Sequence, residues 1–242
     1  MNQIIQQLKD RKSVRVFTDR QITWEEESAI LDAAVNAPTA GNQQLYTIIK
    51  ITDPQLKAQL AESCDHQPFI ATAPLVLVFC ADCRKWYNTF LKFGCAPRMP
   101  GVGDLLLAVS DTNIAAQNAV VAAQSLGIGS CYIGDIMENA EQQRKLLSLP
   151  AYVFPAAMLV FGYPTAGQLE RPKPPRSEMR HIVHENGYRD MDAEELEKML
   201  SVKTGNRPFR EWIQAFCNRK YNSDFSREMT RSVQVFLEDF QK

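Results

Sequence analysis

The chain has 242 residues, of which 45% are hydrophobic and 23% charged. These values are ordinary for a soluble globular protein that buries one or two cores. A formal net charge of −1 excludes the basic excess of a nucleic-acid-binding protein. No segment has the roughly 18 consecutive apolar residues of a membrane span, and the first ten residues lack the apolar run of a signal peptide, so we expect a cytoplasmic protein.

The first hundred residues predict helices and strands in an irregular order. An amphipathic helix occupies the first ten residues. Thr23 and Glu26 form a capping box that begins the second helix, and Pro38 ends it. Three further elements follow along the chain: a strand at 45–51, a helix at 54–64 and a buried strand at 75–80.

A long segment at 104–126 predicts a helix with few charges and many alanines. A helix that is apolar nearly all round is buried, so this segment is either a central core helix or a dimer interface. Gly127 and Gly129 end it. A strand at 130–133, a helix at 139–147 and a strand at 156–162 complete a mixed α+β pattern.

The composition changes after Tyr188. Residues 190–242 are mostly polar and helical, with isolated apolar side chains such as Trp212 and Phe236. This segment is too short to bury a core by itself. We therefore predict one domain over residues 1–189, followed by a helical arm over 190–242 that packs on another surface.

The six cysteines include one closely spaced pair, Cys80-Ala-Asp-Cys83. Cys80 ends an apolar strand, where a cysteine commonly packs as a small hydrophobic residue. A single C-x-x-C pair can also bind a metal or serve in redox chemistry, although metal sites usually need a second pair. Structural packing is the favoured interpretation.

Arg11-Lys12-Ser13-Val14-Arg15 places three cations and a hydroxyl within five residues. Guanidinium groups match phosphate oxygens bidentately, and a serine hydroxyl adds a further hydrogen bond. A solvated helix end is the alternative, because surface charges contribute little.

Three other stretches contain residue types that suit ligand binding. The polar loop 38–44 contains amide and hydroxyl groups that suit a ligand or an ordinary turn. Residues 132–135, Tyr-Ile-Gly-Asp, lie at the end of a predicted strand and could offer backbone N–H groups to a planar ligand, although the glycine spacing is not a dinucleotide fingerprint. Residues 171–176, Arg-Pro-Lys-Pro-Pro-Arg, form a stiff basic segment or a linker.

Taken together and in this order, these motifs resemble the FMN-dependent nitroreductase family, in particular its oxygen-insensitive nitroreductase and flavin reductase group. The resemblance covers essentially the whole chain, from R-K-S-V-R through A-P-T-A-G-N-Q-Q and Y-I-G to P-K-P-P-R and V-H-E-N-G-Y. It implies a mixed, mainly antiparallel sheet flanked by helices, and a homodimer in which the C-terminal arm embraces the partner.

The resemblance also implies site residues. Arg11, Lys12 and Ser13 match the FMN phosphate side, joined by Lys173 and Arg176, and Arg15 matches the cation near the flavin ring. Thr39 and Asn42 match residues that reach the partner's flavin, and Gln67 matches a contact to the ring edge. Tyr132, Ile133 and Gly134 match the strand-end contact to flavin N5. No metal is implied.

The chain departs from the family pattern at two places. The family commonly shows K-P-R, whereas this chain has an extra proline between Lys173 and Arg176. In the family group that this chain resembles, an arginine of the late arm is associated with the 2′-phosphate of NADPH. Lys203 occupies the matching position in this chain. Lysine holds a phosphate as a point charge and not bidentately.

The implied function is ping-pong hydride transfer from NAD(P)H to a nitroaromatic, a quinone or a flavin. No catalytic side chain is required, because the cofactor carries the chemistry. Two alternatives remain: a narrower family reaction such as reductive dehalogenation or flavin breakdown, and a non-enzymatic flavin-binding or redox-sensing protein that uses Cys80 and Cys83.

Overall fold

The protein is described by a computed structural model that covers residues 2–241. The chain divides into two compact units. The first contains the residues up to Arg171 together with those from Glu228 onward, and the second is Pro172–Arg227. Each unit is described by itself below.

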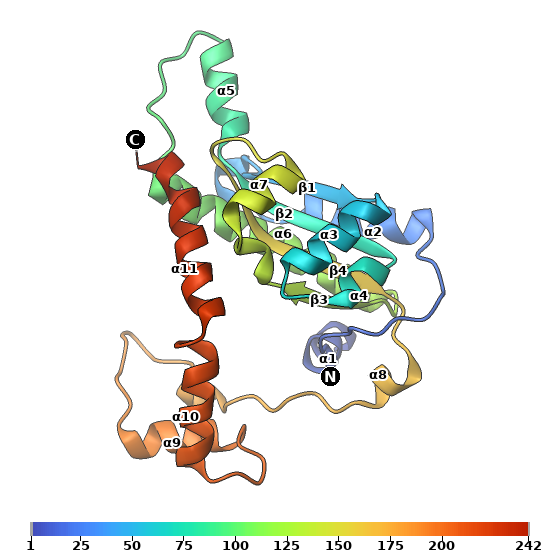
Figure 1. Ribbon diagram of the computed structural model, residues 1–242, viewed down its shortest axis with the longest axis vertical. Coiled ribbons are helices and arrows are strands. Elements are labelled where there is room, and N and C mark those ends of the chain that lie inside the picture. The colour runs from blue at the N-terminus through green and yellow to red at the C-terminus, as the bar shows by residue number, and fades with distance from the viewer. Residues whose placement is uncertain (1, 242) are drawn as a thin grey trace. The chain divides into compact units, whose positions relative to one another are not determined.

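A four-stranded sheet forms the centre of the first unit within the described residues (Figure 1). Its strands lie in the order β1-β2-β4-β3, so β3 is an edge strand, and every neighbouring pair is antiparallel. The bounds are β1 (Tyr46–Ile51), β2 (Leu75–Asp82), β3 (Gly129–Ile133) and β4 (Val153–Gly162). The predicted α+β class with a mainly antiparallel sheet is confirmed.

Strand β4 begins three residues before the predicted strand. It includes Pro155, which lies opposite Cys80 where the register with β2 shifts. A proline cannot donate a ladder hydrogen bond, and such residues are tolerated in a sheet at bulges. The irregularity therefore lets the chain continue as a strand through a residue that usually ends one.

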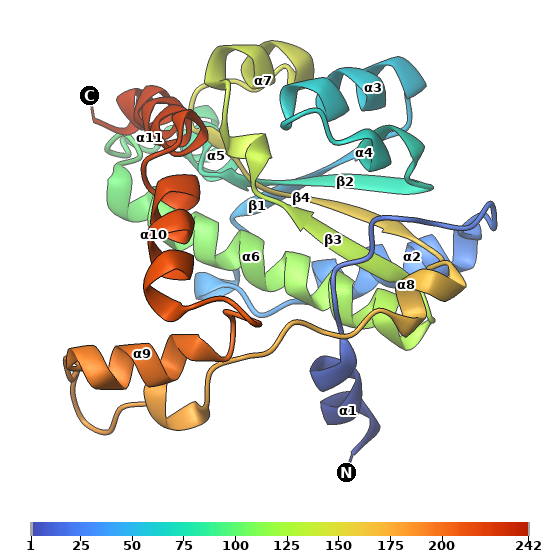
Figure 2. The same ribbon diagram turned by 60° about the horizontal axis from the view of Figure 1, so that its bottom comes forward.

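Helices cover both faces of the sheet (Figure 2). α2 and α6 lie on one face, and α3, α4 and α7 lie on the other. The helices of the first unit before α11 are α1 (Gln3–Asp10), α2 (Trp24–Val35), α3 (Pro54–Ser63), α4 (Pro68–Thr72), α5 (Arg84–Lys92), α6 (Val102–Ser125), α7 (Ala140–Leu147) and α8 (Ala166–Glu170). α4, α5 and α8 are additions to the elements predicted from the sequence.

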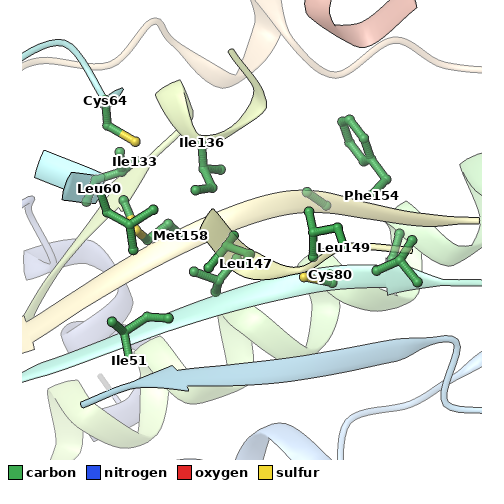
Figure 3. Packing of buried hydrophobic residues seen from close by; sticks show 14 of the residues in the cluster. Ile51, Leu60, Cys64, Cys80, Ile133, Ile136, Leu147, Leu149, Phe154 and Met158 are labelled. Carbon is green, nitrogen blue, oxygen red and sulfur yellow. The ribbon is translucent and has the colours of Figure 1, made fainter. Parts of the chain in front are cut away.

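Buried side chains fill the space on each side of the sheet. On the face of α3 and α7, residues such as Leu60, Leu147 and Met158 pack together (Figure 3). On the opposite face, alanines of α6 including Ala115 and Ala119 are completely buried against the sheet and α2. Small side chains allow this close approach, so α6 is a core helix of the folded unit.

α6 is also the described helix that is long and apolar enough to cross a membrane by length and composition alone. Its mean hydropathy over the most apolar window is 1.2, and 44% of that window is buried inside the protein. Core helices commonly meet both criteria, and the contacts of α6 with the sheet identify it as one.

The tail contributes to both compact units. α9 (Ala193–Ser201) and α10 (Phe209–Lys220) lie in the second unit, whereas α11 (Asp224–Leu237) extends into the first. Phe236 and Phe240 are buried in the core of the first unit, and the Phe236 ring lies edge-on to Phe154 at 5.2 Å between centroids. The last residues are therefore part of the sheet-containing unit because they supply core side chains.

Candidate functional site

The basic motif near the start of the chain lies along the edge strand β3. The Val14 amide donates to the Ser130 carbonyl at 3.0 Å, and Ser13 forms a parallel bridge with Ser130. Gly129 makes this approach possible, since a Cβ there would lie 2.6 Å from Val14 Cγ2. The backbone that carries Arg11 and Arg15 is thus held against the sheet.

Arg11 contacts two side chains of this strand. Its Nη2 donates to Ser130 Oγ at 3.5 Å, and its guanidinium lies 5.6 Å from the centre of the Tyr132 ring. Burial raises the pKa of Tyr132 to about 12, and the charge of Arg11 opposes this rise. The phenol is therefore neutral at physiological pH, and Arg11, Ser13 and Tyr132 form one cluster.

Arg15 points to a different place. Its guanidinium lies 5.9 Å from the centre of the Phe69 ring, and its backbone amide donates to Gln168 Oε1 at 3.1 Å. Phe69 belongs to α4, which Gln67 precedes as the N-cap residue. The predicted ring-side residues Arg15 and Gln67 therefore flank the same short helix.

Gln67 itself is bound to its own loop. Its Nε2 donates to the Cys64 carbonyl at 2.8 Å, and its backbone amide donates to the Ala61 carbonyl at 2.9 Å. Ile133 is buried at the end of β3, and Gly134 follows it as an exposed residue. Gly134 is the most exposed of the three residues in the predicted strand-end contact, since Tyr132 is half-buried and Ile133 is buried.

Lys12 has a structural role in this arrangement. Its ammonium donates to the carbonyls of Leu169, at 2.6 Å, and Arg171. Arg171 in turn donates to the carbonyl of Ser13. Lys12 was predicted to bind the cofactor. Two of its three N–H groups are instead used to tie the basic motif to the end of α8.

The loop from Thr39 to Leu45 is held by a residue that sequence reasoning missed. Asp111 of α6 is 97% buried, since its relative exposure is 3%. Its carboxylate accepts from the Thr39 hydroxyl, from the Ala40 amide at 3.0 Å and from the Leu45 amide at 3.4 Å. The signal was present in the sequence, because a carboxylate in the middle of an alanine-rich helix needs donors nearby.

The loop bound to Asp111 and the cluster of Arg11, Ser13 and Tyr132 lie at different positions along α6. The Tyr132 hydroxyl lies 3.3 Å from Gln117 Oε1. Gln117 follows Asp111 by six residues, which corresponds to about 9 Å along a helix axis. Within the first unit, the structure therefore brings Arg11, Ser13 and Tyr132 together and places the Thr39 loop apart from them.

The remaining predicted residues belong to the second unit. Lys173 is half-buried, whereas Arg176 and Lys203 are exposed. Arg176 Nη1 donates to the Pro174 carbonyl at 3.3 Å, so the extra proline of this chain is a backbone partner of the arginine. Lys203 follows α9 and donates its backbone amide to the Leu200 carbonyl at 2.9 Å.

A cavity of about 290 Å³ lies beside the Thr39 loop. α5 contributes Trp86, Tyr87 and Phe90 to it, and the loop contributes Gln43. Trp86 Nε1 donates to the Gln43 carbonyl at 2.8 Å, which joins α5 to the loop. This aromatic lining comes from residues 84–102, whose pattern gave no prediction.

The Cys80–Cys83 pair is buried. Burial raises the pKa of both thiols to about 12. Thiolates carry the reactivity of cysteine, so these thiols are unreactive at neutral pH and pack as small hydrophobic residues. Among residues 2–241, no group of three or more histidine, cysteine, aspartate or glutamate side chains is arranged to hold a metal ion.

Comparison with known proteins agrees with these features. Residues 8–163 match the model of the nitroreductase family. An FMN reductase [NAD(P)H] from Bacillus subtilis is 30% identical, covering 90% of this chain and 91% of its own length. An oxygen-insensitive NADPH nitroreductase from Salmonella typhimurium is 37% identical, covering 83% of this chain and 79% of its own length.

A solved structure shares the same architecture. The NADPH:FMN oxidoreductase from Vibrio harveyi, solved in complex with NAD+, superposes with a TM-score of 0.81 at 25% identity and covers 98% of both chains. Sequence and fold thus agree over nearly the entire length. The chain belongs to the nitroreductase family.

Proposed function

We propose that this protein is an FMN-dependent oxidoreductase that passes two electrons from NAD(P)H to a small acceptor. The observation that carries the proposal is the basic motif held along the edge strand β3, where Arg11 and Ser13 adjoin Ser130 and Tyr132. The names of the relatives, which include FMN reductases and an NADPH nitroreductase, support the same assignment.

The chemistry of these residues fits FMN. An FMN phosphate carries nearly two negative charges, and guanidinium and hydroxyl groups are the donors that bind phosphate best. Arg11 and Ser13 would hold this phosphate, and the family resemblance assigns Lys173 and Arg176 to the same role. Arg15 and Gln67 would face the ring, with Gly134 offering backbone contact.

FMN supplies the redox chemistry when it is bound, since it can accept hydride from a nicotinamide and return two electrons to a second substrate. The protein orients the cofactor and sets its electrostatic environment. Arg15 would hold a positive charge near the pyrimidine edge of the ring, where negative charge develops on reduction. Donor and acceptor would bind in turn, which gives ping-pong kinetics.

We propose that the active form is a cytoplasmic homodimer. The separation of Thr39 and Asn42 from the Arg11 cluster along α6 supports an assignment in which these two residues serve the partner's site. The helical arm would embrace the partner, and the compact unit Pro172–Arg227 is the part of the tail that is available for this role. Sedimentation should give about twice the mass of one chain.

Lys203 is proposed to contact the nicotinamide donor, because it occupies the place associated with the NADPH 2′-phosphate. It is exposed at the end of α9 in the second unit. A lysine supplies one point charge, in contrast to the bidentate contact of an arginine. The donor is therefore proposed as NAD(P)H, and the Lys203 variant below tests whether the 2′-phosphate is read here.

A narrower reaction is the second candidate. It is favoured by the aromatic cavity that Trp86, Tyr87 and Phe90 line, since a shaped apolar pocket can select one acceptor among many. Thiol-based redox sensing is disfavoured by the buried, high-pKa thiols of Cys80 and Cys83.

The test begins with purified protein. It should be yellow, and denaturation should release FMN and not FAD. Stopped-flow mixing with NADPH should bleach the flavin absorbance, and a nitroaromatic, a quinone or free flavin should restore it. Colourless protein that takes up no added FMN would refute the proposed function, whereas a flavin that no nicotinamide reduces would favour a non-enzymatic binding protein.

A further inference from the structure

The loop from Thr39 to Leu45 has an unusual backbone. Gly41, Asn42 and Gln44 all have positive φ angles of 56°, 56° and 51°, and all three are exposed. This left-handed region of the backbone map is energetically unfavourable for residues other than glycine, including asparagine and glutamine. Since the exposed side chains contribute no core contacts, the conformation must be maintained by other bonds.

Three groups of the loop donate to Asp111, and the Gln44 side chain adds a bond from its Nε2 to the Val35 carbonyl at 3.0 Å. The carboxylate accepts from the Thr39 hydroxyl, the Ala40 amide and the Leu45 amide, so it spans both ends of the loop. Thr39 Oγ1 also accepts from the Gln44 amide at 2.8 Å, which extends the network to a residue with positive φ. The loop is thus closed around one buried charge.

Burying the Asp111 carboxylate and holding the loop at positive φ angles both cost free energy, which suggests that the arrangement serves a function. A buried carboxylate loses its hydration, and several hydrogen bonds are needed to compensate. A simple turn between a helix and a strand could be made from the same residues without a charge in the core. Strained backbone that surrounding contacts hold in place is concentrated at ligand-binding sites.

We propose that Asp111 is a positioning residue that holds the Thr39–Leu45 loop in the conformation needed to contact the flavin. This inference rests on the proposed function. Asp111 acts through Thr39 and the backbone and does not itself reach the cofactor. The same bonds place Gln43, so Asp111 also sets one wall of the aromatic cavity.

Asp111→Asn is the direct test, because it keeps the shape and replaces one acceptor oxygen by an N–H donor group. Whichever way the amide points, a donor of the loop then faces another donor. The dissociation constant for FMN, measured on apoprotein by quenching of flavin fluorescence, should rise roughly tenfold or more, as expected for one lost hydrogen bond to a charged group. Amide hydrogen exchange at Ala40 and Leu45 should accelerate.

Thr112→Ser provides the matched control. Thr112 is the next residue of α6, is completely buried, and donates its hydroxyl to Ala108 within the helix and not to the loop. The Thr112→Ser variant should keep the FMN affinity and the exchange rates of the loop amides unchanged, even if the Tm of the variant falls. Equal effects of the two substitutions on FMN affinity would show that general core damage, not loop positioning, is responsible.

The loop side offers a second route if Asp111→Asn fails to fold. Thr39→Val removes the hydroxyl that donates to Asp111, and Thr39→Ser retains it. Thr39→Val should weaken FMN binding and accelerate loop exchange, and Thr39→Ser should restore both. Slow exchange at Ala40 and Leu45 in Thr39→Val, or in a folded Asp111→Asn, would overturn the inference.

The two proposals can fail separately. If the wild-type protein binds no FMN, the proposed function fails, while amide exchange still tests whether Asp111 holds the loop. If the wild type binds FMN and Asp111→Asn binds it equally well, the positioning role is wrong and the proposed function stands.

Discussion

The three cations of the basic motif differ in what their side chains contact. Arg11 lies over Tyr132, Arg15 lies over Phe69, and Lys12 donates to carbonyls at the end of α8. Charge alone would make them equivalent phosphate ligands. Their partners differ: Lys12 supports the backbone at the end of α8, whereas the phosphate role proposed for Arg11 and the ring-side role proposed for Arg15 are tested by the substitutions below.

Replacing Arg11 by alanine should weaken FMN binding by about 1.5–3 kcal/mol, the range for a hydrogen bond to a charged group. This corresponds to a roughly tenfold to 150-fold rise in the dissociation constant, measured by fluorescence titration. Arg15→Ala should instead lower the flavin reduction potential more than it weakens binding, because its charge matters most after reduction. An unchanged potential in Arg15→Ala would contradict its ring-side role.

Glu138 is a buried carboxylic acid whose environment changes its pKa and links the stability of the protein to pH. It is buried, and its Oε1 has no hydrogen-bond partner among the described residues. Burial, together with the nearby carboxylates Asp135, Asp65 and Glu228, raises its pKa to about 7. The folded protein therefore retains this proton at a pH where the unfolded chain has lost it.

The free energy of unfolding should fall as the pH rises from about 4.5 toward 7 because of Glu138. In this window the folded state binds more protons than the unfolded state, so each increase in pH favours unfolding. Glu138→Gln removes the titration and should flatten this part of the stability profile. Urea unfolding of both proteins at pH 5 and pH 8 measures the difference, and parallel profiles would exclude Glu138 as its source.

At the scale of elements, the contact between the first segment and strand β3 places the basic motif. Gly129 of β3 lies directly under Val14, and Gly162 of β4 lies under Phe17. Gly129 and Gly162 are themselves paired across the sheet. Two adjacent positions without Cβ atoms thus let the N-terminal segment pass close over the sheet edge.

Gly129→Ala should therefore disturb both stability and cofactor binding. The added Cβ would meet the buried Val14 side chain at 2.6 Å, and overpacking of this kind costs about 1–3 kcal/mol. FMN affinity should fall together with Tm, because Arg11 and Ser13 move with the displaced backbone. Gly103→Ala, at an open position of α6 with no atom within 4 Å, is the control that should keep both unchanged or slightly increase Tm.

At the scale of the whole molecule, the chain returns to its first unit after forming the second. Residues from Glu228 onward pack on α7 and β4, where Arg144 pairs with Asp239 at 2.6 Å. Arg231 makes a bidentate contact with Glu141 at 2.8 and 2.9 Å. The second unit is consequently attached to the first at both of its ends.

Phe236→Ala should destabilise the first unit by about 3–5 kcal/mol, the usual cost of removing a buried phenyl ring. Phe236 is 1% exposed, lies against Phe154, and has the Arg144 guanidinium 4.8 Å from its ring centre. Tyr221→Ala, at a residue 78% exposed, should change stability by less than about 0.5 kcal/mol. Similar denaturation midpoints for the two variants would mean that the tail is dispensable to the core.

Lys203→Ala should separate donor selection from cofactor binding. FMN affinity should be unchanged, while the KM for NADPH should rise by the roughly two- to fivefold expected for losing one exposed charge pair of up to about 1 kcal/mol. The KM for NADH should hardly move, because NADH lacks the 2′-phosphate. Equal effects on both donors would place the 2′-phosphate contact elsewhere.

The sequence by itself determined the family and most of the elements. Capping residues such as Thr23 and Asp53 define helix starts locally, and continuous apolar runs define the buried strands. The basic motif and the late proline-rich segment predicted an FMN phosphate site through their resemblance to the family, and their cationic side chains suit a phosphate. The alanine-rich composition of α6 left the choice between core and interface open.

Only the tertiary structure decided which of these groups have partners within the chain. Lys12 is bound to backbone carbonyls, and Asp111 accepts from a loop some seventy residues earlier in the chain. The return of Phe236 to the core likewise joins residues far apart in sequence. Such contacts depend on the way the whole chain packs. A local pattern shows that a carboxylate such as Asp111 needs donors nearby, and only the folded chain shows which residues supply them.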